Sequence, residues 1–195
     1  MNLKKLVTAA VCTMLMAAVA FTAGCGGEKK SDKKVLKVGM ECAYAPYNWS
    51  QTKADGGAVK IAGSNEYAYG YDVMMAKKLA DSMGADLEIH KIEWDGLAPA
   101  VVSGKIDAAI AGMSITSKRK ETVDFTKPYY YATVVALVKK DSEQAKAQSV
   151  ADLKGSVATS QLNTIWYDQI DQVPDVKKLP AIDTVPGMIV ALTSG

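Results

Sequence analysis

Residues 94–130 read WDGLAPAVVSGKIDAAIAGMSITSKRKETVDFTKPYY. Inside this stretch an apolar, strand-like run ends at Gly112, and a short polar segment follows and ends at Arg119. This order places hydrogen-bonding groups at the carboxyl end of a strand, where α/β proteins bind their ligands. The planar guanidinium of an arginine at that point can hold a carboxylate through two parallel hydrogen bonds. The alternative interpretation of the same charges is a solvated cluster over residues 118–121.

The elements around this stretch alternate between strands and helices. The hydrophobic pattern predicts strands over 35–40, 87–92 and 106–111, and helices over 71–83 and 97–102. Strands that alternate with helices are typical of parallel sheets that are covered on both faces. The sequence therefore predicts the α/β fold class.

The remaining segments indicate a hairpin and a second lobe. Residues 47–67 are rich in Gly, Ser, Asn, Asp and Gln without periodicity, which predicts a surface hairpin or loop. The β-branched run 133–138 is expected to be a strand that crosses into a second lobe. That lobe has its own predicted strands over 156–160 and 176–179, with a helix over 164–170 between them.

A weak internal repeat bears on the end of the chain. Residues 99–104 form a helix end with a glycine stop, and the expected strand 106–111 follows. Residues 189–195 repeat the helix and the glycine, and there the sequence stops. A second lobe of this size is too small to bury an ordinary core. We therefore expect the chain to be a C-terminally incomplete version of a longer protein, with the second lobe truncated.

The N-terminus has the organisation of an export signal. Lys4 and Lys5 precede the apolar residues 6–21, and the small residues Thr22-Ala23-Gly24 lead into Cys25. This pattern resembles a bacterial lipoprotein signal over residues 1–24, in which Cys25 is lipidated and becomes the new N-terminus. A plain signal peptide with an incidental cysteine is the alternative.

Composition excludes several classes of protein. Residues 25–34 are polar and predict a flexible tether. Loss of Lys4 and Lys5 with the signal leaves 21 of the 23 Lys and Arg residues against 21 Asp and Glu, so a mature chain would be formally neutral and nothing indicates nucleic-acid binding. Cys42 would be the remaining cysteine, which excludes an intrachain disulfide. No spacing of Cys and His typical of a metal site is present, and no cofactor is expected.

The ordered motifs of the chain resemble a known family, the extracellular solute-binding proteins of polar amino acid ABC transporters, which have the type II periplasmic binding fold. The resemblance covers residues 35–195. The matching motifs are Tyr44-Ala-Pro-Tyr47-Asn-Trp49, Gly70-Tyr71-Asp72-Val73, Trp94, Gly104-Lys-Ile-Asp107, Gly112-Met-Ser-Ile-Thr116, Arg119, Phe125, Pro128-Tyr129 and Asp152-Leu-Lys-Gly155. The resemblance implies a two-lobed α/β protein, with lobe 1 over 35–130, lobe 2 over 131–195 and the ligand in the cleft between them.

The resemblance also implies roles for residues of the first lobe. Arg119 matches the arginine that binds the ligand's α-carboxylate bidentately, and Ser114 matches a residue that touches both the carboxylate and the ammonium. Gly112 matches the position whose carbonyl accepts from the ammonium. Tyr44 and Trp94 fall where two side chains sandwich the ligand's side chain. Packing in the core is the alternative for both, although Trp94, flanked by Glu93 and Asp95, is poorly placed for full burial.

In the second lobe, Thr164 matches the residue whose backbone N–H completes the carboxylate site. Ser160, Gln161 and Asn163 are expected to line the same wall. The sequence departs from the family's pattern at Leu162, where a glycine is common. Because of this departure, the resemblance does not determine the backbone conformation around Leu162.

Four further residues have competing interpretations. Glu41 occupies a position from which an acidic residue reaches basic ligand side chains, and an acid beside an aromatic pair favours a cation. Its alternative role is a solvated charge at a strand end. Asp72 is expected to cap the helix that follows it. His90 is expected on the face of a strand, and Cys42 lacks a recognisable base.

The function implied by the resemblance is capture of a polar amino acid and its delivery to an ABC transporter permease with its ATPase subunit. A basic amino acid is slightly favoured. The protein is expected to be a monomer and not an enzyme, anchored by lipid at the extracellular face of the cell membrane. A dehydratase-like enzyme and the ligand-sensing part of a receptor remain alternatives on the same fold.

In the family, the acid that pairs with the ligand's ammonium follows the position of Gly195, so we expect this chain to bind weakly or not at all.

Overall fold

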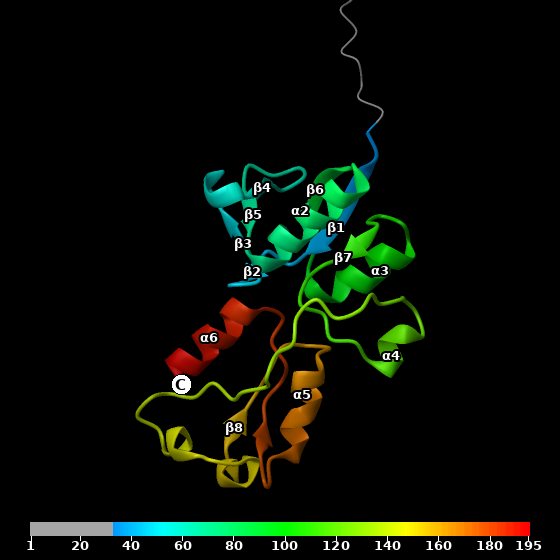
Figure 1. Cartoon of the computed structure of the whole chain (residues 1–195). Helices are drawn as coiled ribbons and strands as arrows, with labels where there is room; N and C mark the ends of the chain where they lie inside the picture. Colours follow the sequence, from blue (N-terminus) through cyan, green and yellow to red (C-terminus); the bar gives the residue numbers. More distant parts are fainter. Residues whose placement is uncertain (1–32) are drawn as a thin grey trace, which may run out of the picture. The chain divides into compact units, whose positions relative to one another are not determined.

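The computed structural model describes residues 33–195 (Figure 1). The predicted signal peptide over 1–24 and the predicted lipidation of Cys25 lie outside the described residues. The predicted division into lobes at residues 130 and 131 stays a prediction. Within residues 33–195, no helix is long and apolar enough to cross a membrane.

A three-stranded parallel sheet forms the centre of the fold. β1 (Val35–Met40) lies in the middle, between β6 (Asp86–Lys91) and β7 (Ala108–Ala109). Along β1 the buried positions first alternate and then become continuous, as expected for a central strand that is covered on both faces. The predicted parallel sheet is confirmed, although β7 is shorter than the predicted strand over 106–111.

Two helices pack on the strands, and their bounds match the prediction from the sequence. α2 (Tyr71–Met83) contacts β6 and two strands of the neighbouring sheet, and α3 (Leu97–Val102) contacts β1 and β7. α2 ends at Gly84, which adopts a left-handed φ of 62° and donates its N–H to the carbonyls of the last turn. The glycine signal therefore marked the end of this helix correctly.

The polar segment after β1 folds into a second, antiparallel sheet with the order β2-β3-β5-β4. Its strands are β2 (Ala43–Tyr44), β3 (Asn48–Gln51), β4 (Val59–Lys60) and β5 (Tyr67–Tyr69), with a 3-10 turn, η1 (Asp55–Gly57), between β3 and β4. The predicted hairpin over 47–67 is thus part of this sheet.

The downstream part of the chain contains a small parallel pair. β8 (Val157–Ala158) pairs with β9 (Lys177–Lys178), with α5 (Ile165–Gln169) and η5 (Ile170–Gln172) between them, and α6 (Val185–Ser194) follows. These elements fall within the predicted strand–helix–strand order and are shorter than predicted. The other short helices of the described chain are η2 (Trp94–Gly96), α4 (Ser117–Lys120), η3 (Glu143–Lys146) and η4 (Val150–Leu153).

The predicted crossing strand over 133–138 is wrong. This segment has no strand assignment, and its side chains are largely exposed, with Val135 80% exposed. A β-branched run gains its preference for a strand from pairing and packing. Among residues 33–195 no strand pairs with this segment.

The buried apolar side chains of the described chain all lie between Leu36 and Ala111. They come mainly from β1, α2, β6 and α3, so one core holds the parallel sheet and its helices together. Packing is tight at Gly39, where an added Cβ would lie 2.5 Å from the Cδ1 atom of Ile106. The candidate site lies at the edge of this core, after the carboxyl ends of β1 and β7.

Candidate ligand-binding site

A cavity of about 410 Å³ brings together residues from distant parts of the chain. Seven of the nine residues predicted to bind ligand line it: Glu41, Tyr44, Trp94, Gly112, Ser114, Gln161 and Thr164. The other two, Arg119 and Asn163, are not among its lining residues, and they contact each other beside Trp94. Residues separated by more than a hundred positions in the sequence therefore meet at one cavity.

Arg119 is placed by the short helix α4 and by two backbone carbonyls. Thr116 caps α4 through its hydroxyl, which accepts from the Arg119 backbone N–H at 3.1 Å. The guanidinium donates to the carbonyls of Ser114 (2.8 Å) and Asn163 (3.1 Å). It lies 5.2 Å from the ring centroid of Trp94. Burial lowers the pKa of Arg119, so Arg119 is not one member of a solvated lysine cluster.

Trp94 and Arg119 share one acceptor on the opposite segment. The indole Nε1–H of Trp94, which lies in η2, donates to the Asn163 carbonyl at 3.4 Å. Asn163 has a left-handed φ of 54°, a conformation that asparagine tolerates better than most residues. The backbone of Leu162 is held by a hydrogen bond from its N–H to the Ile182 carbonyl at 2.9 Å. With leucine at position 162, the left-handed turn falls at Asn163.

Glu41 is buried at the end of β1, with 5% of its surface exposed. Its Oε1 atom accepts from Gln161 Nε2 at 2.8 Å, and the same Nε2 donates to the Asp183 carbonyl at 2.9 Å. Burial raises the pKa of Glu41, the bond from Gln161 opposes that rise, and the charges of Glu93 and Asp95 add to it. The alternative of a solvated strand-end charge is therefore wrong.

Thr164 lies at the start of α5 and is buried. Its hydroxyl donates to the Gln161 carbonyl at 2.7 Å and accepts from the Tyr167 N–H at 3.2 Å. Thr164 thus caps the helix and fixes the turn that carries Gln161 and Asn163. The role expected for its backbone N–H stays a prediction.

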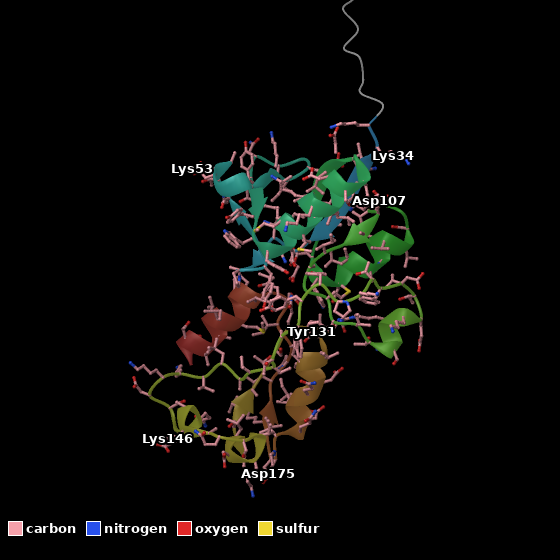
Figure 2. The ribbon with its side chains drawn as sticks, viewed as in Figure 1. Lys34, Lys53, Asp107, Tyr131, Lys146 and Asp175 are labelled. Carbon is pink, nitrogen blue, oxygen red and sulfur yellow. The ribbon has the colours of Figure 1, made fainter. Side chains whose placement is uncertain are left out.

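An aromatic wall extends the cavity beyond the predicted pair. The rings of Tyr44 and Tyr47 lie 4.9 Å apart, and those of Tyr47 and Tyr130 lie 5.3 Å apart. The hydrogen bond to Tyr130, with burial, raises the pKa of Tyr47 to about 12. Tyr131, labelled in Figure 2, also lines the cavity although 83% of its surface is exposed. Further lining residues that the sequence did not single out as ligand contacts are Phe125, Lys127, Tyr129, Trp166 and Met188.

Asp72 has a structural role other than the predicted one. The residue before α2 is Gly70, and no side chain caps the helix. The Asp72 carboxylate is fully buried and accepts from Asn48 Nδ2 (2.7 Å) and from the Tyr129 hydroxyl (2.8 Å). Burial raises the pKa of Asp72, and these two bonds oppose that rise. Asn48 and Tyr129 are 24 and 57 positions away from Asp72 in the sequence, so no local pattern indicated these two contacts.

The described residues offer poor nucleophiles. Cys42 is buried, and burial raises the pKa of its thiol to about 12. His90 lies on β6, as predicted, and its Nε2 atom is 2.7 Å from Glu88 Oε1. Over residues 33–195, no cluster of His, Cys, Asp and Glu could hold a metal ion.

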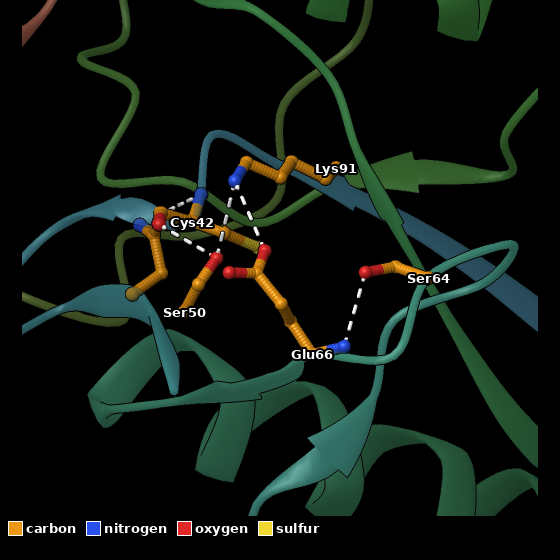
Figure 3. Close-up of polar contacts among 6 residues, drawn as sticks. Cys42, Ser50, Ser64, Glu66 and Lys91 are labelled. Atoms are coloured by element: carbon orange, nitrogen blue, oxygen red, sulfur yellow. Dashed lines mark hydrogen bonds and ion pairs between the residues drawn. The ribbon is translucent and has the colours of Figure 1, made fainter. Parts of the chain in front are cut away.

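The surroundings of Cys42 are held by polar contacts of the backbone and of neighbouring side chains (Figure 3). The Cys42 carbonyl accepts from the backbone N–H (2.9 Å) and the hydroxyl (3.2 Å) of Ser50. Lys91 donates to the Ser50 hydroxyl at 3.3 Å and lies 3.4 Å from the Glu66 carboxylate. These contacts join β3, β6 and the turn after β1.

Comparison with known proteins identifies the family of the chain. Residues 36–178 match the family described as bacterial extracellular solute-binding proteins, family 3. The ABC transporter arginine-binding protein 1 of Escherichia coli (strain K12) is 30% identical over 194 residues, which cover 99% of this chain and 68% of that protein.

Two solved structures are also similar. One is the arginine-bound form of a truncated ArgBP from T. maritima, with 29% identity and a TM-score of 0.68 over 83% of this chain and 69% of that one. The other is the ancestral amino acid-binding protein AncCDT-1, described as a precursor of cyclohexadienyl dehydratase, with 32% identity and a TM-score of 0.68 over 83% of this chain and 66% of that one.

Coverage of the curated relatives is partial. The chain spans between 41% and 68% of the length of the first four. The family that the sequence motifs resemble and the type II periplasmic binding fold are both confirmed. On the matched residues 36–178, the chain belongs to the bacterial extracellular solute-binding proteins, family 3.

Proposed function

We propose that this chain binds an L-α-amino acid in the cavity and delivers it to the permease of an ABC transporter. The observation that carries the proposal is the presence of a positive and a negative side chain at one site. Arg119 lies beside the cavity, where its guanidinium contacts the lining residues Trp94 and Ser114, and the buried carboxylate Glu41 lines the cavity. An amino acid has a carboxylate for the first of these groups and a cation for the second.

Arg119 is the proposed partner of the ligand's α-carboxylate. Its guanidinium has five N–H donors, and its two recorded side-chain bonds go to neutral carbonyls, those of Ser114 and Asn163. A carboxylate offers the guanidinium an opposite charge and a bidentate acceptor, which a neutral carbonyl does not. We therefore infer that a carboxylate replaces the Asn163 carbonyl at the guanidinium and takes up the Trp94 indole N–H as well.

Glu41 is the proposed partner of a basic ligand side chain. It is the sole carboxylate among the described residues that line the cavity, and it accepts from the neutral amide of Gln161. A cationic group would give this buried charge an opposite charge at close range, and Tyr44 and Trp94 supply aromatic faces nearby. L-Arginine is the favoured ligand, which agrees with the arginine named for the similar proteins.

The proposed affinity is modest. A ligand must displace the hydrogen bonds that Arg119 makes to Asn163 and that Glu41 makes to Gln161, and no second carboxylate among the described lining residues is left for the α-ammonium. We propose a dissociation constant on the order of 1 mM, which corresponds to a binding free energy of about −4 kcal/mol.

Calorimetric titration of the purified chain with L-arginine tests the carboxylate site. Arg119→Lys keeps the positive charge and loses the planar fork, so binding should weaken by at least about tenfold. The matched control is Lys118→Arg, since Lys118 is exposed and adjacent, and its affinity should stay within about twofold of the parent. Equal affinity of the Arg119→Lys variant and the parent would contradict the proposed role.

We further propose that the chain is exported, lipidated at Cys25 and held as a monomer at the extracellular face of the membrane. The polar segment 25–34 would then be a tether that lets the binding domain reach the permease. Metabolic labelling with a palmitate analogue tests the anchor. Label and membrane association should both disappear in Cys25→Ala and persist in Cys42→Ala, and light scattering of the detergent-solubilised chain should give the mass of a monomer.

We propose binding without chemical turnover. AncCDT-1, which is similar to this chain, is described as a precursor of a dehydratase, so catalysis on this fold is the competing function. The raised pKa of the Cys42 thiol and the contact of His90 with Glu88 argue against a nucleophile and base pair from these residues. Mass spectrometry of L-arginine after long incubation should recover it unchanged, and an accumulating product would support the enzyme.

A further inference from the structure

A hydrogen-bonded chain, buried at Asp72 and exposed at Gly112, leads from the core to the wall of the cavity. At its centre is Asp72 on α2, fully buried, which accepts from Asn48 Nδ2 at 2.7 Å and from the Tyr129 hydroxyl at 2.8 Å. The Tyr129 hydroxyl in turn accepts from the Gly112 N–H at 3.0 Å. Both Tyr129 and Gly112 line the cavity, whereas Asp72 and Asn48 do not.

The direction of every bond in this chain is determined. The Asn48 Oδ1 atom accepts from the Cys42 N–H at 2.9 Å, so the Asn48 amide nitrogen must face Asp72. A carboxylate only accepts, and the Tyr129 hydroxyl has a single hydrogen, which it gives to Asp72. The hydroxyl oxygen is therefore left as an acceptor for Gly112.

Gly112 occupies a point where the backbone has little freedom. Its φ is 62°, in the left-handed region, and an added Cβ would lie 3.3 Å from Cε1 of Tyr44. Two residues later, the Ser114 carbonyl accepts from the Arg119 guanidinium. The Gly112 peptide therefore begins the short segment whose Ser114 carbonyl contacts Arg119.

We propose that Asp72 and Tyr129 are positioning residues of the ligand cavity: Asp72 holds the Tyr129 hydroxyl as an acceptor for the Gly112 N–H and so fixes segment 112–114. Neither residue needs to touch the ligand for this role. The expected effect on ligand affinity rests on the proposed amino acid binding. The expected effects on the Gly112 amide and on Arg119 do not.

Two variants break the chain at different points. Tyr129→Phe removes the acceptor of the Gly112 N–H and keeps the ring. Asp72→Asn replaces one of the two acceptor oxygens by an amide donor. Depending on how the new amide is oriented, this donor faces the Asn48 amide nitrogen or the Tyr129 hydroxyl, and both of these groups donated to Asp72. Tyr71→Phe is the matched control, because the Tyr71 hydroxyl donates to the Tyr129 backbone carbonyl at 3.1 Å and not to its hydroxyl.

The experiment is amide and side-chain NMR of the whole chain, first without any amino acid and then with L-arginine. Hydrogen exchange of the Gly112 amide should be at least about tenfold faster in Tyr129→Phe and Asp72→Asn than in Tyr71→Phe. The Arg119 Nε–H resonance should move in the same two variants. In the second step, L-arginine should bind those two variants about tenfold more weakly than the parent, and Tyr71→Phe within about twofold.

The outcomes separate the two proposals. An unchanged Gly112 amide in Tyr129→Phe overturns the positioning role, whatever the ligand does, and this variant serves even where Asp72→Asn does not fold. A changed Gly112 amide with an unchanged arginine affinity overturns it as well. A parent chain that binds no amino acid refutes the proposed ligand only. In that case, movement of the Arg119 resonance in both Tyr129→Phe and Asp72→Asn supports the positioning role, and an unmoved resonance refutes it.

Discussion

Arg119, beside the cavity, and Glu41, in its lining, are the two charged residues proposed to contact the ligand, and each faces a neutral partner. Arg119 donates to two backbone carbonyls, and Glu41 accepts from the amide of Gln161. Neither takes part in an ion pair within the described chain. Burial opposes both charges, because it lowers the pKa of the arginine and raises that of the acid. Both residues therefore have an electrostatic benefit to gain from a ligand.

Replacement of Glu41 by glutamine should raise the free energy of unfolding and weaken the binding of L-arginine. A glutamine keeps an acceptor for Gln161 and removes a buried charge, so the free energy of unfolding at pH 7 should rise by about 1 kcal/mol. Affinity for L-arginine should fall by at least about tenfold, because a buried charge pair is lost. Urea unfolding and titration with L-arginine measure the two effects.

The pH dependence of this variant follows from the raised pKa. A carboxyl whose pKa is higher in the folded state binds its proton more tightly there, so it contributes stability below its unfolded pKa and loses it as pH rises through the folded pKa. The advantage of Glu41→Gln should therefore vanish below the ordinary value of 4.5 and grow as the pH rises through the folded pKa of Glu41. Glu121→Gln, at an exposed position, is the matched control. A constant difference between the variant and the parent across this range would contradict the buried charge.

Cys42 should resist alkylation in the folded chain. Its side chain is buried, and burial raises the pKa of the thiol to about 12, whereas the thiolate is the reactive form. At pH 8 iodoacetamide should label Cys42 at least about a hundredfold more slowly than in urea-unfolded chain, since the folded thiolate fraction is small. Mass spectrometry of the peptide that contains Cys42 follows the rate. Equal rates in folded and unfolded chain would show that the thiol is accessible.

At the scale of elements, local signals predicted the upstream part of the fold well. β1, α2 and α3 have the predicted bounds, because each combines a hydrophobic period with a clear stop such as Gly84. The segment 133–138 failed because β-branched residues only favour a strand when a neighbour pairs with them. The segment 47–67 was predicted only as a surface hairpin or loop, and the four-stranded sheet of β2 to β5 was not predicted, since pairing between segments leaves little trace in a polar sequence.

Gly39 tests how tightly β1 packs against α3 and against Ile106, which precedes β7. A methyl group there would meet Ile106 Cδ1 at 2.5 Å and Leu97 Cδ2 at 3.1 Å, so Gly39→Ala should lower the free energy of unfolding by about 1–3 kcal/mol. Gly104→Ala is the comparison, because its surroundings are open and its φ is 72°. Its cost should be about 1–2 kcal/mol, from backbone conformation alone. Urea unfolding of both variants measures the costs, and a Gly39→Ala chain as stable as the parent would contradict the tight packing.

At the scale of the whole molecule, the candidate site is an assembly of distant segments. The sequence and its family resemblance predicted seven of the cavity's lining residues, because those residues sit in recognisable motifs. They did not predict that Gln161 bonds to Glu41 across 120 positions, or that the Asn163 carbonyl accepts from Arg119 and Trp94. Such contacts depend on how separate segments meet, which no local pattern records.

The central claim is that the cavity recognises an amino acid by both of its charges. The most direct measurement is an NMR titration of the Trp94 indole N–H, a reporter that stands beside the Arg119 guanidinium and detects millimolar binding. Three matched compounds separate the charges: L-arginine, agmatine, which lacks the carboxylate, and L-citrulline, which lacks the side-chain charge.

L-Arginine should shift the Trp94 resonance with a dissociation constant on the order of 1 mM, and the other two compounds at least about tenfold more weakly. Weaker binding of agmatine would show that the carboxylate is recognised, and weaker binding of L-citrulline would show that the side-chain cation is recognised. A Trp94 resonance that responds equally to L-arginine and agmatine, or to none of the three, would contradict the account.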